Sequence, residues 1–348
     1  MKNEAKSSRS RTPLLLLLAG PLLTPLGCNP VAEYQAVYTG DTDPPRFAGI
    51  EPVDAGEVRL RFDEPVEALE ESLFLDGNPL PAESLAGSGE LVSLRPSTPF
   101  NPGQEYHFQG VFADAEGNSS SVATRFYGPN PDLPAMLINE FNPEGTRSNP
   151  DMIELITLEA GNIGGATVYE GAPSDWESRL VLPAVEVSAG AYILLHWKPE
   201  GTPEEIDELR RPDESGGINA HDEAWDYWLR GGDGYTNTNG SLVLCEHPGG
   251  AIMDAVIFST KRFDPEEKNR GFYWSSVLLR NEEIVAAGEW EIEGEEIIPE
   301  DAIDPEDSSA TRSINRTPGA PDTNSPADWH IVPSSGATFG YENSVERY

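Results

Sequence analysis

The strongest constraint on the fold lies between residues 135 and 158, where two short apolar runs flank a loop of turn-forming residues. The first run is Leu137-Ile138-Asn139-Glu140-Phe141, and the second run covers residues 151–156. The loop of residues 142–150 contains Asn, Pro, Gly and Ser, which favour turns. Because similar runs recur among 31 prolines and 33 glycines, the sequence predicts an all-β protein. We expect two β-sandwich domains, the second with helical and loop insertions.

The first 28 residues have the organisation of an export signal. A basic head precedes a leucine-rich run from Leu14 to Leu26, which is too short and too interrupted by Pro and Gly to span a membrane with confidence. The ending Gly27-Cys28 resembles a bacterial lipoprotein signal. We therefore predict a signal peptide over residues 1–28, with Cys28 as the lipidation site, and a tether over residues 29–41. Ordinary cleavage near Gly27 and a Cys28–Cys245 disulfide are the alternatives.

The charge of the chain limits its partners. The sequence contains 23 Lys and Arg residues against 60 Asp and Glu residues, which gives a formal net charge of -37. Such a field repels phosphate backbones, so we expect no nucleic-acid binding. Calcium or a basic protein partner would fit this charge, and the lipid anchor predicts a membrane as a further partner.

The first domain is predicted over residues 42–128. The segment Glu57-Val58-Arg59-Leu60-Arg61-Phe62 alternates apolar and charged residues, as a strand with one buried face does. Further strands are predicted at residues 72–75, 90–95, 105–112 and 122–127. Asp-x-x-Pro-Pro at residues 41–45, Phe62-x-Glu64-Pro65-Val66, Pro102-Gly103-x-x-Tyr106 and the acidic turn at residues 114–118 together resemble bacterial immunoglobulin-like domains of the surface-layer type. A proline-rich linker follows at residues 129–134.

The second domain is predicted over residues 135–340. It adds strands at residues 179–187 and 191–197, and a hairpin of residues 241–245 with 251–258. The Asn-Glu strand, the Asp-x-Ile-Glu-Leu strand, Gly190-Ala191-Tyr192, the hairpin with Asp254, the Ser-x-x-Arg segment of residues 309–316 and Asp328-Trp329 resemble the lamin tail domain. That family is an immunoglobulin-like sandwich of nuclear lamins and bacterial envelope proteins. The resemblance implies a fold and a compartment but no activity.

Two insertions interrupt the second domain, at about residues 198–230 and 261–307. In the first, residues 203–211 have acids at the start and arginines at the end, which predicts a short helix. In the second, Tyr273, Trp274, Val277 and Leu278 recur at helical spacing and predict a helix over residues 267–287. The acidic residues 289–307 are predicted to form a loop.

The sequence carries no local catalytic motif. Its five histidines are scattered, and neither a Gly-x-Ser-x-Gly elbow nor a phosphate loop is present. Two segments resemble weak calcium sites, because carboxylates and amides are ligands that calcium prefers. The first candidate set is Asp114, Glu116 and Asn118, and the second is Asp233 and Glu246. A plain structural turn is the favoured interpretation of the first set, and a Gly-rich entry to the strand at residues 241–245 is the favoured interpretation of the second.

Three functions fit these observations. The first is a non-catalytic, lipid-anchored envelope protein that binds a ligand or acts as a spacer on the periplasmic or cell-surface side. The second is an envelope-bound, metal-assisted hydrolase whose site is built from the two insertions. The third is an assembly factor of the outer surface.

Overall fold

The first domain is a β-sandwich built from strands that alternate apolar and polar residues. This computed structural model describes residues 41–264, 266 and 268–348. The long strand β2 (Glu57–Ala68) buries Val58, Leu60 and Phe62. Its first half pairs with β6 and its last residues pair with β7, so β2 runs through both layers of the sandwich. The other strands are β1 (Phe47–Asp54), β3 (Phe74–Leu75), β4 (Asn78–Pro79), β5 (Leu85–Ala86), β6 (Gly89–Leu94), β7 (Glu105–Ala113) and β8 (Ser119–Tyr127).

The predicted strands of this domain are present, with one shortened. The strand predicted at residues 72–75 is confined to β3, because Glu70–Ser72 form a 3-10 turn. The Ser72 hydroxyl donates to the carbonyl of Leu69 at 2.6 Å and stabilises that turn. A second 3-10 turn covers Ala82–Ser84. The core of the domain contains Phe62, Phe100, Phe108, Phe112 and Phe126 among its aromatic members.

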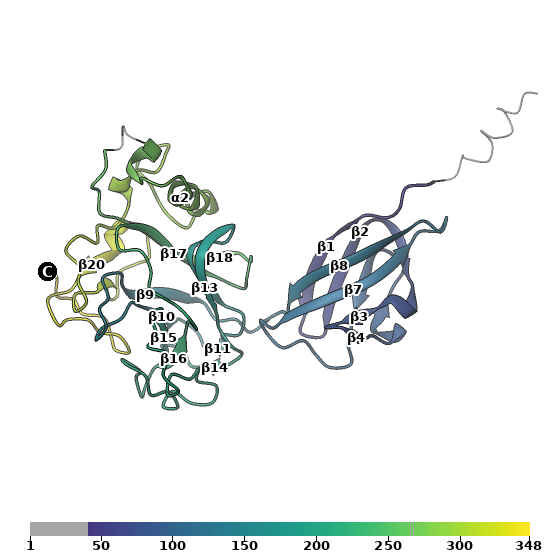
Figure 1. Ribbon diagram of the computed structural model, residues 1–348, viewed down its shortest axis with the longest axis horizontal. Helices are drawn as coiled ribbons and strands as arrows, with labels where there is room; N and C mark the ends of the chain where they lie inside the picture. Colours follow the sequence, from purple (N-terminus) through teal and green to yellow (C-terminus); the bar gives the residue numbers. More distant parts are fainter. Residues whose placement is uncertain (1–40, 265, 267) are drawn as a thin grey trace, which may run out of the picture. The chain divides into compact units, whose positions relative to one another are not determined.

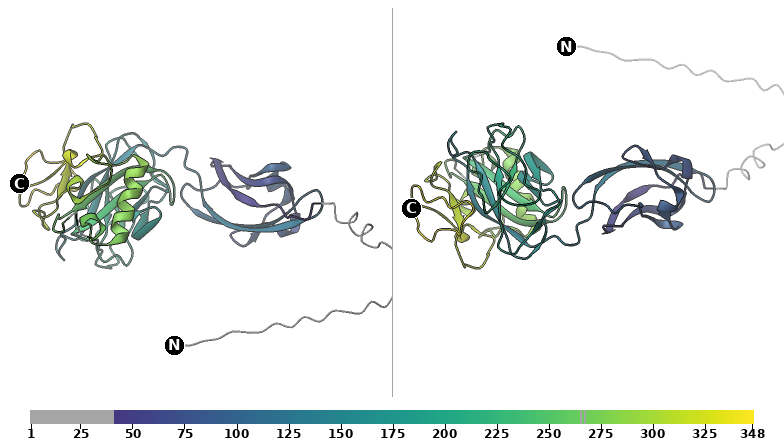
Figure 2. Two further views of the ribbon diagram at one scale, coloured as in Figure 1. Left: turned by 90° about the horizontal axis from the view of Figure 1, so that it is seen from above. Right: turned by 90° about the horizontal axis from the view of Figure 1, so that it is seen from below.

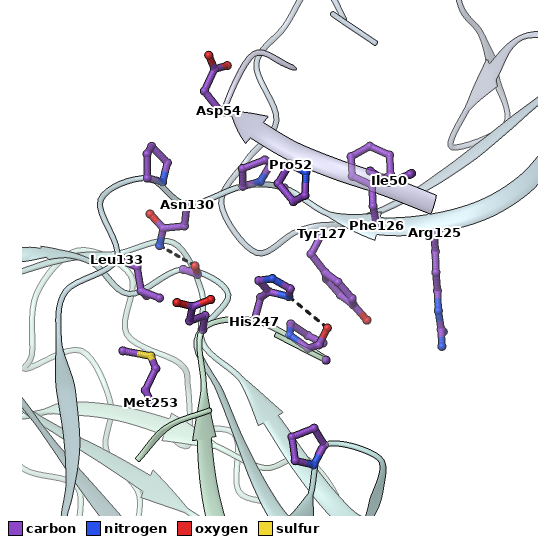
Figure 3. A pocket seen from close by; sticks show the side chains of 18 of the residues that line it. Ile50, Pro52, Asp54, Arg125, Phe126, Tyr127, Asn130, Leu133, His247 and Met253 are labelled. Atoms are coloured by element: carbon purple, nitrogen blue, oxygen red, sulfur yellow. Dashed lines mark hydrogen bonds between the residues drawn. The ribbon is translucent and has the colours of Figure 1, made fainter. Parts of the chain in front are cut away.

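The proline-rich segment between the two cores is fixed to the second domain. Nδ2 of Asn130 donates to the carbonyl oxygen of Asn162 at 2.7 Å. It also donates to the carbonyl oxygen of Gly164 at 2.8 Å (Figure 3). Leu133 packs against the second core, as does Met253. Asn130 and Leu133 therefore attach the segment to the second domain.

The second domain is a larger β-sandwich (Figure 1). One sheet has the strand order β16-β15-β10-β9-β19-β20 and the other has the order β13-β12-β17-β18. One hydrophobic core fills the space between them and includes Phe141, Tyr169, Trp197, Phe258 and Trp329. The prediction of an all-β chain with two sandwich domains is confirmed. The strands are β9 (Met136–Asn142), β10 (Met152–Thr157), β11 (Gly161–Asn162), β12 (Thr167–Ala172), β13 (Asp175–Val181), β14 (Glu186–Val187), β15 (Tyr192–His196), β16 (Trp225–Trp228), β17 (Asn239–Cys245), β18 (Ile252–Ser259), β19 (Ile314–Arg316) and β20 (Trp329–Ile331).

A β-bulge at Asn139 decides which side chains of β9 enter the core. Ile138 pairs with Leu155 and Glu140 pairs with Glu154, so Asn139 has no partner across the strand. The extra residue changes the alternation, because Ile138 and Phe141 both enter the core although they are three residues apart. Glu140 and Glu154 consequently point away from the core, on the outer face of the sheet.

The helix predicted over residues 203–211 is absent, and these residues form a turn followed by an irregular loop. The helix predicted over residues 267–287 is shorter than expected. Residues Lys268–Gly271 form a 3-10 turn, and α2 covers only Ser275–Ala287. Tyr273 precedes the helix with a φ of 68°, so its ring is not on the helical stripe. Gly288 ends α2 in the left-handed conformation that glycine adopts most easily.

The second insertion contributes to the core instead of forming only a surface loop. Helix α2 contacts β12, β17 and β18 (Figure 2). Beyond it, Trp290, Ile297 and Ile303 are buried in the core of the second domain. The indole nitrogen of Trp290 donates to the carbonyl of Asp301 at 2.9 Å. No helix in the described residues is both long and apolar enough to cross a membrane.

Candidate functional site

A buried ion pair joins three strands of the second domain. Asp254 on β18 and Arg316 on β19 lie 2.7 Å apart, and the Asp254 side chain is almost completely buried. Asp254 Oδ2 also accepts from the backbone nitrogen of Ile138 at 2.6 Å, while Arg316 Nε donates to the carbonyl of Ile138 at 2.9 Å. The two side chains therefore satisfy both polar backbone groups of Ile138 just before the bulge.

The guanidinium of Arg316 makes two further contacts. It donates to Asp322 at 2.7 Å and lies 4.7 Å from the ring centroid of Trp329. Asp254, Arg316 and Trp329 come from the hairpin of residues 241–258, the segment of residues 309–316 and the Asp328-Trp329 pair that the sequence analysis singled out. The structure brings these three residues together, although they are far apart in the chain.

The outer face of the sheet carries a second polar cluster, which the C-terminal segment covers. Glu140 accepts from the backbone nitrogen of Thr338 at 2.9 Å and from its hydroxyl at 2.7 Å, and also accepts from Ser313. Glu154 accepts from the backbone nitrogen of Gly340 at 2.6 Å. Both carboxylates are fully buried. We call residues 338–343 the C-terminal cover.

Asparagine side chains connect this cover to the bulge. Nδ2 of Asn343 donates to the backbone oxygen of Asn139 at 2.9 Å and to the carbonyl of Arg316 at 2.8 Å. Nδ2 of Asn139 in turn donates to Glu154 at 2.6 Å. The unpaired residue of the bulge is thus held from both sides by polar contacts.

A buried pair of His196 and Asp226, which the sequence patterns did not predict, lies at the edge of the same sheet. Nε2 of His196 lies 2.6 Å from Asp226 Oδ1, and both side chains are fully buried. The ring of His196 stacks on Trp228 with centroids 3.7 Å apart. Asp226 Oδ2 accepts from the backbone nitrogen of His221 at 2.8 Å. The pair fixes the parallel pairing of β16 with β15. The available signal was the run Trp225-Asp226-Tyr227-Trp228 inside the predicted insertion.

The acids of residues 203–211 organise loops instead of starting a helix. Glu205 accepts from the backbone nitrogens of Glu200 and Gly201, each at 2.7 Å. Glu208 accepts from the backbone nitrogens of Ser215 and Asp226 at 2.9 and 2.8 Å. Because these buried carboxylates satisfy backbone donors of neighbouring loops, their tertiary contacts override the local helical preference.

A cavity of about 320 Å³ lies in the second domain beside the start of α2. Its lining includes Glu170, Glu177, Ser241, Trp274, Ser276 and Arg280. Arg280 donates to Asp175 at 2.9 Å and to Glu177 at 2.8 Å. Trp274 is 60% exposed at the edge of this cavity. This aromatic and acidic cavity is the candidate binding site of the second domain.

The comparisons with known proteins concern this same domain. Residues 134–331, more than half of the chain, match the protein family TP_1001_2nd, described as a protein second domain. The chain belongs to this family. A protein of Treponema pallidum (strain Nichols), described as "Uncharacterized protein", is 26% identical over 156 residues, which are 45% of this chain and 39% of that relative. The matched part is therefore less than half of the relative.

One solved structure is also similar. A DUF4876 family protein from Bacteroides thetaiotaomicron VPI-5482 aligns with 81% of this chain and 90% of its own, at 9% identity and a TM-score of 0.28. A score this low carries no argument about fold or function.

The first calcium candidate lies outside the TP_1001_2nd domain, in the turn between β7 and β8. Oδ1 of Asp114 accepts from the backbone nitrogen of Asn118 at 2.8 Å, and Oδ2 accepts from its Nδ2 at 2.7 Å. Glu116 is exposed at the tip of the turn. The structure brings Asp114 and Asn118 together, and their side chains close the turn, whereas the Glu116 side chain is exposed.

The second calcium candidate does not come together. Asp233 precedes β17 and Glu246 follows it, so the seven residues of that strand separate them. The two ends of this strand lie roughly 20 Å apart, because a strand rises about 3.3 Å per residue. Residues 239–245, which lie between Asp233 and Glu246, form the buried strand β17 and not a calcium-binding loop.

The structure describes one of the two cysteines of the chain. Cys28, the predicted lipidation site, lies outside the described residues, as do the rest of the predicted signal peptide and most of the tether. Cys245 is a free thiol in the core of the TP_1001_2nd domain. Burial raises the pKa of Cys245 to about 12, so the thiol is protonated at neutral pH.

The buried acids predict an unusual pH dependence of stability. Burial, with the charge of Glu140 as a second cause, raises the pKa of Glu154 well above its usual value. Burial also raises the pKa of Asp254 to about 7, against the opposing effect of Arg316. Above about pH 4 the folded domain therefore keeps protons on these carboxyls that the unfolded chain has released. The free energy of unfolding falls as the pH rises, until the carboxyls of the folded domain have also lost their protons above about pH 7.

We therefore expect the melting temperature of the second domain to fall between about pH 5 and pH 8. Calorimetry over this interval measures the effect. Glu154→Gln should flatten the curve, whereas Glu204→Gln, at an exposed position, should leave its slope unchanged. A melting temperature that rises with pH in both the wild type and the variants would show that this assignment is wrong.

Proposed function

We propose that this chain is a non-catalytic, lipid-anchored binding module on the extracytoplasmic side of the cell envelope. The leader ending at Cys28 supports the anchor and the compartment. The proposal places the domain boundary at residues 129–134, because the two hydrophobic cores lie on either side of that segment.

The observation that carries the proposal is the use of the buried acids in the second domain. Glu140, Glu154, Glu205, Glu208 and Asp254 each accept a hydrogen bond from a backbone nitrogen. Carboxylates used in this way hold segments of chain in place, and a rigid scaffold of this kind suits a binding module.

The resemblance to lamin tail domains is part of the same proposal. Asp254, Arg316 and Trp329 lie in contact, and Glu140 pairs with Glu154 across β9 and β10. The segments that carry the resemblance therefore meet in one region of the fold. The two insertions of the alternative hydrolase are attached to different sheets, because β16 extends one sheet and α2 contacts the other.

The anchor is tested with Cys28→Ala in cells that produce the full chain. We expect the wild type to partition into detergent and the variant to appear in the aqueous phase, since two or more acyl chains are needed for stable attachment. Gln35→Ala, a change in the predicted tether, is the matched control and should partition as the wild type does. Detergent partitioning of Cys28→Ala, together with mass spectra that contain no acylated peptide, would refute the anchor.

A further inference from the structure

We propose that the cavity beside α2 binds a cationic side chain, lysine or arginine, of a basic protein partner. This inference rests on the proposed binding function and specifies its ligand. It starts from Trp274, which lines the cavity, and from its neighbour Tyr273. Trp274 is 60% exposed and Tyr273 is 46% exposed, although residues of this size are usually buried.

The neighbouring rings hold Trp274 in a defined position. Its ring meets Tyr273 edge to face, with centroids 4.6 Å apart, and Tyr273 stacks on Phe263 at 4.8 Å. The backbone nitrogen of Trp274 donates to Phe272 at 2.8 Å. Nδ2 of Asn269 donates to the carbonyl of Tyr273 at 2.6 Å. An exposed indole that is fixed in this way binds a cation through its face without a large loss of side-chain entropy.

The charges around the cavity favour the same ligand. Glu170 and Glu177 line it, and Asp175 lies next to it through its contact with Arg280. Arg280 is the one basic residue of the lining, and it is neutralised by Asp175 and Glu177. Three carboxylates against one guanidinium leave a local excess of negative charge. The net charge of -37 adds a long-range attraction for a basic partner.

The size and chemistry of the site indicate a single side chain and not a large ligand. A volume of about 320 Å³ is at the lower end of the range for small-molecule sites. The lining combines one aromatic face with carboxylates and the hydroxyl groups of Ser241 and Ser276. A lysine or arginine side chain can place its stem on the indole and its charged group near the acids.

The test measures binding of a pentalysine peptide to the purified full chain by calorimetry, at about 0.15 M salt to screen the general field. We expect Trp274→Ala and Glu177→Gln each to weaken binding by about tenfold. Two matched controls, Tyr341→Ala and Glu204→Gln, remove an exposed aromatic ring and an exposed acid elsewhere in the domain. These controls should change the affinity by less than about twofold, and melting curves verify that all four variants fold.

Equal binding by the wild type and both cavity variants would overturn the inference, because attraction by net charge alone would then explain the affinity. Saturable binding of a neutral oligosaccharide in place of the peptide, lost in Trp274→Ala but kept in Glu177→Gln, would also overturn it. These outcomes are independent of the Cys28→Ala result. A chain that is anchored in the envelope but does not bind the peptide would refute this inference alone.

Discussion

Arg316→Met is expected to lower the free energy of unfolding of the second domain by about 3–5 kcal/mol. The substitution leaves the Asp254 carboxylate buried without its cation. It also removes the donor to the carbonyl of Ile138 and the contact with the Trp329 ring. Urea denaturation followed by tryptophan fluorescence measures the loss. For a domain of this size we expect the melting temperature to fall by roughly 10 °C.

The matched control for this prediction is Arg147→Met. The Arg147 side chain is 94% exposed and pairs with Glu200 at 3.4 Å, so its removal should cost less than about 1 kcal/mol. The double variant Arg316→Met with Asp254→Leu should recover part of the loss, because no buried charge is then left unpaired. Equal stability of Arg316→Met and Arg147→Met would contradict the role of the buried pair.

Asn343→Ala is expected to destabilise the same domain by about 2–3 kcal/mol. The change removes the donor to the backbone oxygen of Asn139 and to the carbonyl of Arg316. These acceptors are buried under the C-terminal cover and would lose a partner there. Hydrogen exchange of the Gly340 amide, which donates to Glu154, should become faster.

Asn237→Ala is the control for the asparagine prediction, because Asn237 is exposed and its amide donates to Glu144 at 3.0 Å. Its stability should remain within about 0.5 kcal/mol of the wild type. If Asn343→Ala left both the stability and the exchange of Gly340 unchanged, the C-terminal cover would not be held by Asn343.

The strands could be predicted because their signals are local. The runs at β9, β10, β17 and β18 are apolar, of strand length and bounded by turn residues. The same reasoning found Asp254 and the Ser-x-x-Arg segment as motif residues. It did not predict that Asp254 contacts Arg316, because the register that brings them together depends on the bulge at Asn139.

The failures have a different physical cause. The acids Glu205 and Glu208 follow a helical pattern, but each is buried against backbone nitrogens of other segments. His196 and Asp226 are 30 residues apart and meet through a parallel pairing that no local pattern indicates. The helical spacing of the sequence predicts Trp274 on the apolar stripe of a helix. Its ring is exposed instead, because the chain turns at Tyr273 before α2 begins. In each case tertiary contacts, and not propensity, decide the structure.

The central claim is that the buried acids of the second domain serve the fold and not a reaction. The most direct test is an assay of the purified chain against a panel of ester, phosphodiester and glycosidic substrates, with Glu140→Gln and Glu154→Gln variants measured in parallel. We expect no turnover by any of the proteins, and altered melting temperatures in the variants only. Turnover by the wild type that either substitution abolishes, while the variant still unfolds cooperatively at the wild-type temperature, would contradict the claim.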